Sequence, residues 1–236
     1  EREGSSSFTP RFGLGACFSR DLSARNSPRV ICTATFSSSL KIRNPIAKNA
    51  CDPGVPTSLD QAVVKGTTAT ASGPFYFVYL VAIRGSVPEI AGLQCGITYE
   101  NNSQSSVANG SGVDVFTWNL CATLQFPETA WAAAGSGNTI TWDYINNCQT
   151  GEVAVAGYFY VGAYTADTVR VIPKPANERA TVATCSPLYE IELARSDMGY
   201  VAFSPGAAMA GCNPCLADCA AENPIPVEAT TWGRIK

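Results

Sequence analysis

Three closely spaced cysteines near the end of the chain are the residues best placed for chemistry. They form the run Cys212-Asn-Pro-Cys215-Leu-Ala-Asp-Cys219. A C-x-x-C pair with a further cysteine nearby can act as a redox pair, or bind zinc or an iron–sulfur cluster. Neither a fourth nearby thiolate nor a histidine completes a ligand set here, so we interpret the run as structural bridging in a turn that Pro214 restricts.

The chain contains no histidine. This excludes Ser-His-Asp and Cys-His nucleophilic sites, histidine-ligated zinc or copper, and a histidine pH switch. Most ordinary hydrolase and metalloenzyme mechanisms are excluded with them.

Ten cysteines are spread over the whole length. An even number of cysteines without histidine partners predicts up to about five disulfides, formed in an oxidising compartment. The sequence leaves their connectivity open. We predict that all of them are structural: Cys17, Cys32, Cys51, Cys95, Cys121, Cys148, Cys185, Cys212, Cys215 and Cys219.

Carboxylates offer a second possible chemistry. Glycoside hydrolysis needs two of them about 5–10 Å apart, and Glu190 and Glu192 share one strand face while Asp143 follows Trp142. With 19 acidic residues in the chain, such pairs also arise by accident. No calcium loop, P-loop or dinucleotide fingerprint is present. We therefore predict a protein that is not an enzyme and has no cofactor and no metal site.

Aromatic side chains offer binding rather than catalysis. The run Glu152–Tyr164, read at the two-residue period of a strand, places Val153, Val155, Phe159 and Val161 on one face. The other face carries a candidate interface or ligand platform made of Tyr158, Tyr160 and Tyr164. Such a face suits a second sheet, a sugar or another chain. For the tryptophans at 118, 131 and 142, we favour core packing over sugar stacking.

Strand patterns recur along the remainder of the chain. Phe75–Ile83 is apolar on both faces and predicts a covered central strand, Val113–Phe126 reads as one long strand, and Glu152–Tyr164 is expected to form a hairpin with Thr168–Ile172. Ala207–Ala221 is the best helix candidate. Short strands with turns between them predict an all-β fold, an antiparallel β-sandwich of immunoglobulin-like or jelly-roll-like kind, stapled by disulfides and preceded by an extended arm.

The net charge of the chain changes from positive to negative at about residue 60. Residues 1–60 carry eight basic and five acidic groups, whereas residues 61–236 carry eight basic and fourteen acidic groups. We predict a basic N-terminal arm with one or two strands, followed by a sandwich body. The arm is expected to dock on a neighbouring subunit, to fold back on its own body or to contact nucleic acid; the acidic balance of the whole chain disfavours the last. The candidate contacts are Arg2, Arg11, Arg20 and Arg25.

Four segments resemble a group of uncharacterised secreted bacterial β proteins. They are Gly157-Tyr-Phe-Tyr-Val-Gly-Ala-Tyr-Thr-Ala-Asp, the following Cys185, the Gly211-Cys-Asn-Pro-Cys215 turn and the ending Thr230-Thr-Trp-Gly-Arg-Ile-Lys236. The resemblance covers roughly the last 150 residues and implies an exported bacterial β protein. The group has no established activity that the resemblance could assign to this chain.

The first hypothesis is therefore a structural subunit of an extracellular filament, tube or sheath, in which the arm of one copy engages the next. The alternative is a secreted or cell-surface carbohydrate-binding or adhesion module. The expected partners are other copies of the chain or glycans, without nucleic acid. No apolar run approaches the ~18–20 residues that span a bilayer, and a chain that opens at Glu1 fits a precursor whose signal peptide has been removed.

Overall fold

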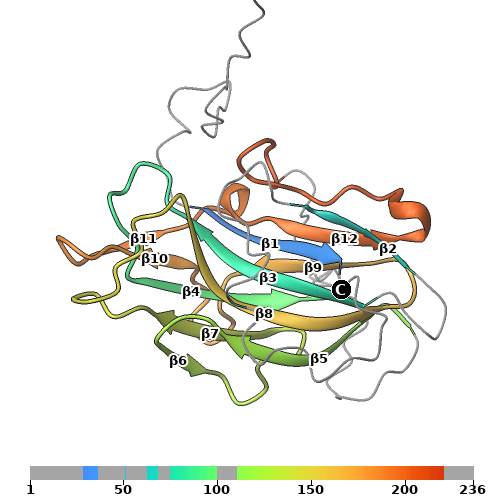
Figure 1. The fold of residues 1–236 in the computed structure, drawn as a ribbon, viewed down its shortest axis with the longest axis horizontal. Helices are drawn as coiled ribbons and strands as arrows, with labels where there is room; N and C mark the ends of the chain where they lie inside the picture. Colours follow the sequence, from blue (N-terminus) through green and yellow to red (C-terminus); the bar gives the residue numbers. More distant parts are fainter. Residues whose placement is uncertain (1–28, 37–50, 52–62, 69–74, 100–110, 221–236) are drawn as a thin grey trace, which may run out of the picture.

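The computed structural model describes the chain except residues 1–28, 37–50, 52–62, 69–74, 100–110 and 221–236. Of residues 29–36 it describes only the course of the backbone. The described residues form two stacked β-sheets (Figure 1).

The first sheet contains four antiparallel strands. Their order is β1 (Arg29–Phe36), β3 (Phe75–Ile83), β8 (Val153–Ala163) and β5 (Val113–Leu120). As predicted, Phe75–Ile83 is a central strand, because β1 and β8 flank it on either side.

The second sheet contains eight strands and is antiparallel except where β12 pairs with β2. Its main path runs through β11 (Glu190–Glu192), β10 (Thr181–Ala183), β4 (Gly92–Thr98), β9 (Asp167–Ile172), β12 (Tyr200–Ser204) and β2 (Lys65–Thr67). On the other edge of β4 lie β7 (Ser136–Thr141) and then β6 (Leu124–Pro127). Two short 3-10 turns, Arg195–Asp197 and Pro205–Ala207, complete the described elements.

The main core lies between the two sheets. Val78, Leu80 and Ala82 of β3 pack there with Leu93 and Ile97 of β4, because alternate residues of a strand point to the same face. Burying each large aliphatic side chain contributes about 1.5–3 kcal/mol. The predicted antiparallel β-sandwich and its disulfide staples are confirmed.

Strand β8 contains a bulge that reverses its alternation. Leu80 pairs with Gly157 and Val81 with Val155, so one extra residue of β8 lies between these pairs. Val153 and Val155 consequently lie with Tyr158 on the outer face, whereas Phe159 is in the core. The prediction that Val153, Val155 and Phe159 share one face was wrong, since the inserted residue shifts the period.

The predicted hairpin of Glu152–Tyr164 with Thr168–Ile172 was also wrong. Strand β8 belongs to the first sheet and β9 to the second, so the chain arches from one sheet to the other between them. Hydrogen bonds at the start of β5 hold this arch. The Tyr164 N–H donates to Gly112 O (2.9 Å), and the Val113 N–H donates to the Asp167 carboxylate (2.8 Å).

The predicted single strand Val113–Phe126 is divided into β5 and β6, which lie in different sheets. A bulge at Phe116 turns that ring toward Phe75 and Tyr160, on the outer face of the first sheet. Leu124 of β6 is 51% exposed. The chain leaves the first sheet at Cys121, where a disulfide to Cys51 fixes it.

The helix predicted at Ala207–Ala221 is absent from its described part, residues 207–220, which form turns. The Asn213 side chain accepts a hydrogen bond from the Cys215 N–H (3.0 Å), and Cys212 is bonded to Cys219. Such side-chain bonding favours a turn over a helix. The structural bridging predicted for this cysteine run is confirmed for Cys212 and Cys219.

Two parts of the predicted arm are joined to the sandwich. Strand β1 pairs with β3 along its whole length, and Cys51 is bonded to Cys121. The boundary near residue 60 stays a prediction, because most of residues 1–60 lie outside the described part. No helix among the described residues is long and apolar enough to cross a membrane.

Candidate binding surfaces

A hollow of about 360 Å³ opens where strand β5 approaches β6 and the turn at residues 127–135. We call it the tryptophan pocket. Its lining residues include four aromatic and two polar ones, with alanine, valine and proline between them, and no aspartate, glutamate, lysine or arginine. The six are Tyr99, Phe116, Thr117, Trp118, Gln125 and Trp131.

The aromatic wall of this pocket continues into the core. Trp118 and Trp131 meet edge to face, with ring centroids 5.2 Å apart. Both rings also pack on Phe159, at 4.6 Å and 5.6 Å, and Phe159 is fully buried. The wall is therefore held by the packed interior of the sandwich. Trp142, the third tryptophan considered above, is buried in the core, as predicted.

The amide of Gln125 has a fixed orientation. Its Oε1 accepts hydrogen bonds from Trp118 Nε1 (2.8 Å) and from Asn138 Nδ2 (2.9 Å). An indole N–H is only a donor, so the atom facing it must be the glutamine oxygen. The Nε2 group has no hydrogen-bond partner among the described residues, and neither has the buried Trp131 Nε1.

Tyr99 is an uncharged residue in the lining of the pocket. Burial, and secondarily the charges of Asp114 and Asp167, raise the pKa of this phenol to about 12, although a backbone hydrogen bond opposes the shift. Its hydroxyl donates to Ala132 O (3.3 Å). A phenol is neutral at physiological pH with or without this shift, and the same two carboxylates disfavour an anion beside it.

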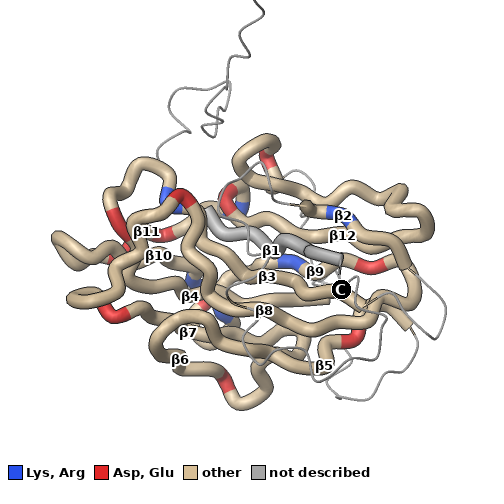
Figure 2. Tube along the Cα trace, in the orientation of Figure 1, with Lys and Arg blue, Asp and Glu red and all other residues tan. Residues whose placement is uncertain are grey.

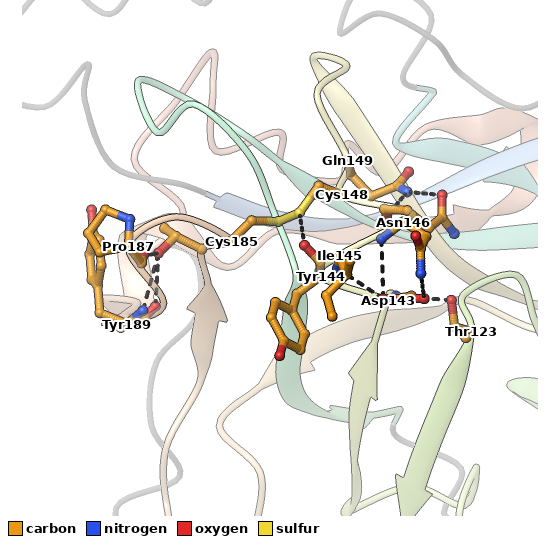
Figure 3. Close-up of a disulfide and its surroundings, with 12 residues drawn as sticks. Thr123, Asp143, Tyr144, Ile145, Asn146, Cys148, Gln149, Cys185, Pro187 and Tyr189 are labelled. Carbon is orange, nitrogen blue, oxygen red and sulfur yellow. Dashed lines mark hydrogen bonds between the residues drawn. A yellow bond between two sulfur atoms is a disulfide. The ribbon is translucent and has the colours of Figure 1, made fainter.

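A second candidate surface lies at one end of the sandwich, where the Cys148–Cys185 disulfide joins the loop after β7 to the loop after β10 (Figure 3). We call residues 143–149 and 184–189 the loop end. Four large side chains there are well exposed: Tyr144 (54%), Ile145 (71%), Leu188 (64%) and Tyr189 (46%).

Hydrogen bonds fix both loops of the loop end. Asp143 accepts from Ile145 N (2.9 Å), Asn146 N (3.3 Å) and Asn146 Nδ2 (2.8 Å), and these bonds, led by the one from the Asn146 side chain, lower the pKa of Asp143. In the other loop, Thr184 Oγ1 donates to Pro187 O (2.6 Å) and accepts from Tyr189 N (3.3 Å). Figure 3 shows these bonds on either side of the disulfide.

The surroundings of the loop end are acidic, but the described residues there do not form a metal site. A carboxylate oxygen of Glu89 and the sulfurs of Cys148 and Cys185 lie within 4.8 Å of one another. The sulfurs are bonded to each other, so they supply no thiolate. Asp143 adds a second carboxylate, and Figure 2 shows acidic positions on the loops at the β10–β11 end.

The three predicted tyrosines do share the outer face of the first sheet. Tyr158 is 4% exposed and packs edge to face on Phe77 (5.3 Å). Tyr160 contacts Phe77 and Phe116, and Tyr164 covers Gly162, where a Cβ atom would lie 2.9 Å from its ring and hydroxyl. Burial raises the pKa of Tyr160 and Tyr164. Tyr158 therefore packs within the chain, while Tyr160 and Tyr164 are half-buried.

The other predicted site residues have mixed outcomes. Arg2, Arg11, Arg20 and Arg25 lie outside the described residues. Glu190 and Glu192 both pair with Arg179, at 3.7 Å and 3.6 Å, on an exposed surface. Gln125 and the exposed side chains of the loop end were not predicted. The only signal for Gln125 was a polar residue between Leu124 and Phe126 in a strand.

Among the residues that the structure describes, six cysteines form three disulfides, Cys51–Cys121, Cys148–Cys185 and Cys212–Cys219. The prediction of a disulfide at Cys95 was wrong. Its thiol points into the core from β4, is fully buried, and has a pKa that burial raises to about 12. Cys215 is buried beside Tyr79 and Val81. The side chains of Cys17 and Cys32 lie outside the described residues.

No protein-family model and no curated protein matches the chain. Among solved structures, the chain is similar to a cohesin module from a Clostridium perfringens family 33 glycoside hydrolase, with 8% identity over 61% of this chain and 99% of that chain and a TM-score of 0.37. It is also similar to a cohesin from Clostridium thermocellum in a type I cohesin–dockerin complex (10% identity, 59% and 90% coverage, TM-score 0.37). A third similar structure is the sixth cohesin of Acetivibrio cellulolyticus scaffoldin B, with 10% identity over 60% of this chain and 93% of that chain and a TM-score of 0.37.

Proposed function

We propose that the protein is a non-catalytic structural subunit of an extracellular filament, tube or sheath, in which the N-terminal arm of one copy engages the loop end of the next. The observation that supports this most is the loop end itself. It presents Tyr144, Ile145, Leu188 and Tyr189 to solvent on loops that a disulfide and turn hydrogen bonds already fix.

Fixed apolar side chains suit a protein partner. Ordering a flexible side chain on binding costs about 0.5–1.5 kcal/mol, and a surface that is already ordered avoids most of this cost. Exposed tyrosine and large aliphatic side chains provide the apolar contact area that such a site requires.

Charge favours the N-terminal arm of a second copy as the partner. Glu89 and Asp143 give the loop end an acidic rim, whereas residues 1–28, which precede β1, carry four basic and three acidic groups. This segment also contains Phe8, Phe12 and Phe18, so the arm carries both apolar and basic residues. Opposite charges around an apolar contact steer association and fix its register.

A contact between two different surfaces of the same chain does not close on itself. Head-to-tail contacts of this kind give rings or open polymers, depending on the rotation between copies. Disulfides at the loop end and elsewhere suit an oxidising, extracellular location. The resemblance to secreted bacterial proteins agrees with this location and stays a proposal.

Analytical ultracentrifugation and negative-stain microscopy of the full chain test the proposal. We expect polymers that shorten as salt rises, since salt screens the charged rim. The double variant Tyr144→Ser/Leu188→Ser and a chain lacking residues 1–27 should both remain monomeric. Leu216→Ser, at an 80% exposed position in the C-terminal turn, is the matched control and should polymerise as the wild type does.

Two outcomes contradict the proposal. One is a monodisperse 24.8 kDa wild-type particle at high concentration. The other is unchanged polymer in the Tyr144→Ser/Leu188→Ser variant, which would place the contact elsewhere. The alternative, a carbohydrate-binding module that uses Tyr158, Tyr160 and Tyr164, stays a prediction, and burial of Tyr158 would leave a sugar only the other two rings.

A further inference from the structure

The tryptophan pocket has no part in the proposed assembly. It is built by β5, β6 and the turn at residues 127–135, whereas the loop end is built by residues 143–149 and 184–189. Its volume of about 360 Å³ falls within the range of small-molecule sites, which is roughly 300–1,000 Å³.

The walls of the pocket suit a flat apolar surface that carries hydroxyl groups. Trp118 and Trp131 provide aromatic surface, and their contacts with each other and with Phe159 hold these rings against the core. Pyranose rings combine an apolar face with a polar rim, and aromatic side chains pack well against such faces.

One polar group in the wall is prepared to donate. Trp118 and Asn138 both donate to Gln125 Oε1, which leaves the two Nε2 hydrogens without a partner among the described residues. A half-buried donor without a partner gains most from a ligand that supplies an acceptor, since an unpaired polar group is costly when water is excluded.

The charge around the pocket selects against anions. No lysine or arginine lines it, and the buried carboxylates of Asp114 and Asp167 act on Tyr99 at its edge. A carboxylate or sulfate on a ligand would meet repulsion here and no cationic partner.

We infer that the tryptophan pocket is a binding site for a neutral saccharide, whose ring packs on Trp118 and Trp131 and whose oxygen accepts a hydrogen bond from Gln125 Nε2. This site is independent of the proposed assembly, so the chain would both polymerise and display a sugar-binding site along the polymer.

Tryptophan fluorescence of the full chain provides the test, because two of its four tryptophans line the pocket. The probes are cellohexaose, chitohexaose and mannohexaose as neutral saccharides, with hexagalacturonate as the anionic comparison. We expect saturable quenching by at least one neutral probe and none by hexagalacturonate. The measurement is repeated with Tyr144→Ser/Leu188→Ser, which should bind equally well, so that failure of assembly and failure of sugar binding are distinguished.

Gln125→Glu isolates the role of the donor. A carboxylate can still accept from Trp118 and Asn138 but donates nothing, so affinity should fall at least about tenfold. The matched control is Phe126→Ala, one residue along β6, where the side chain is 57% exposed and outside the pocket lining. Trp131→Leu is a second variant that removes an aromatic ring from the wall, and it too should weaken binding.

The inference is overturned by any of three results. These are no saturable quenching by the neutral probes up to about 10 mM, stronger binding of hexagalacturonate than of every neutral probe, and wild-type affinity in both folded variants. Should Gln125→Glu fail to fold by circular dichroism, wild-type affinity in Trp131→Leu alone overturns it.

Discussion

The tryptophan pocket and the loop end both bring aromatic rings to the surface, but different forces hold them. In the pocket, Trp118 and Trp131 rest on Phe159, a fully buried residue of β8. At the loop end, Tyr144 and Tyr189 stand on loops fixed by a disulfide and by turn hydrogen bonds. One surface depends on the core, and the other depends on local bonds.

This difference indicates what each surface can bind. A hollow backed by a packed core keeps its shape and holds one fixed polar group, which suits a small ligand. Projecting side chains on stapled loops offer area without a cavity, which suits another protein. Each surface can therefore be damaged without damage to the other.

The largest effect is expected for Phe159→Ala. Truncating a buried phenylalanine costs about 3–5 kcal/mol of unfolding free energy, because it removes apolar burial and leaves a cavity. Urea unfolding should show this loss, and saccharide binding should fall with the aromatic wall. Tyr144→Ala, at the exposed loop end, should change stability by less than about 0.5 kcal/mol. A cost below about 1 kcal/mol for Phe159→Ala would contradict support of the pocket by the core.

The next effect is expected for Cys148→Ser/Cys185→Ser. This disulfide closes a loop with a sequence separation of 37, and chain entropy predicts that its loss costs about 3–4 kcal/mol. Limited proteolysis should then cleave within residues 143–149, while saccharide binding persists in the folded fraction. As a control, Cys212→Ser/Cys219→Ser opens a separation of only 7 and should cost about 2 kcal/mol. Equal costs for the two would contradict the loop-length account.

The two tryptophans of the pocket provide a smaller, matched comparison. Trp118→Phe removes a hydrogen bond to Gln125 Oε1 and should cost about 1–2 kcal/mol. Trp131→Phe removes an N–H that has no partner in the described structure, so it should cost about 1 kcal/mol less than Trp118→Phe. Urea unfolding measures both. A larger cost for Trp131→Phe would show that its N–H has a partner.

The sandwich was predictable because its strands have strong local patterns. Phe75–Ile83 is apolar on both faces and is indeed central, and tyrosines two residues apart do share a face. The errors arose where a single residue changes the geometry. An extra residue in β8 reversed its faces, and short connections at Tyr164 and Cys121 carried the chain to the other sheet instead of continuing a hairpin or a strand.

The candidate surfaces were less predictable than the fold. Gln125 matters because Trp118 and Asn138 hold its oxygen, and Asn138 comes from a different strand, which residue types cannot reveal. The loop end exists because Cys148 bonds to Cys185, and the number of cysteines does not give their pairing. Nor does the number of cysteines show which of them are unpaired. Cys95 is a core residue because it lies on the inner face of β4.

The two surfaces should lose stability at opposite ends of the pH range, the pocket in alkali and the loop end in acid. At the pocket, Tyr99 has a raised pKa of about 12, so its contribution to stability is complete below its unfolded pKa of about 10 and is lost as pH rises through about 12. At the loop end, Asp143 has a lowered pKa. Its contribution is complete above its unfolded pKa of about 3.9 and is lost as pH falls through the lower folded value.

The smallest expected effect is therefore local loosening of the loop end in acid. Protonation of Asp143 weakens its acceptance from the N–H groups of Ile145 and Asn146, so the hydrogen-exchange protection of these two amides should fall below about pH 4. Asp143→Asn should show weaker protection at neutral pH and no further fall in acid, because the amide does not titrate. Tyr99→Phe is the control and should retain the acid response while losing part of the alkaline one. Protection that stays constant in the wild type down to about pH 2 would mean that the disulfide alone fixes the loop.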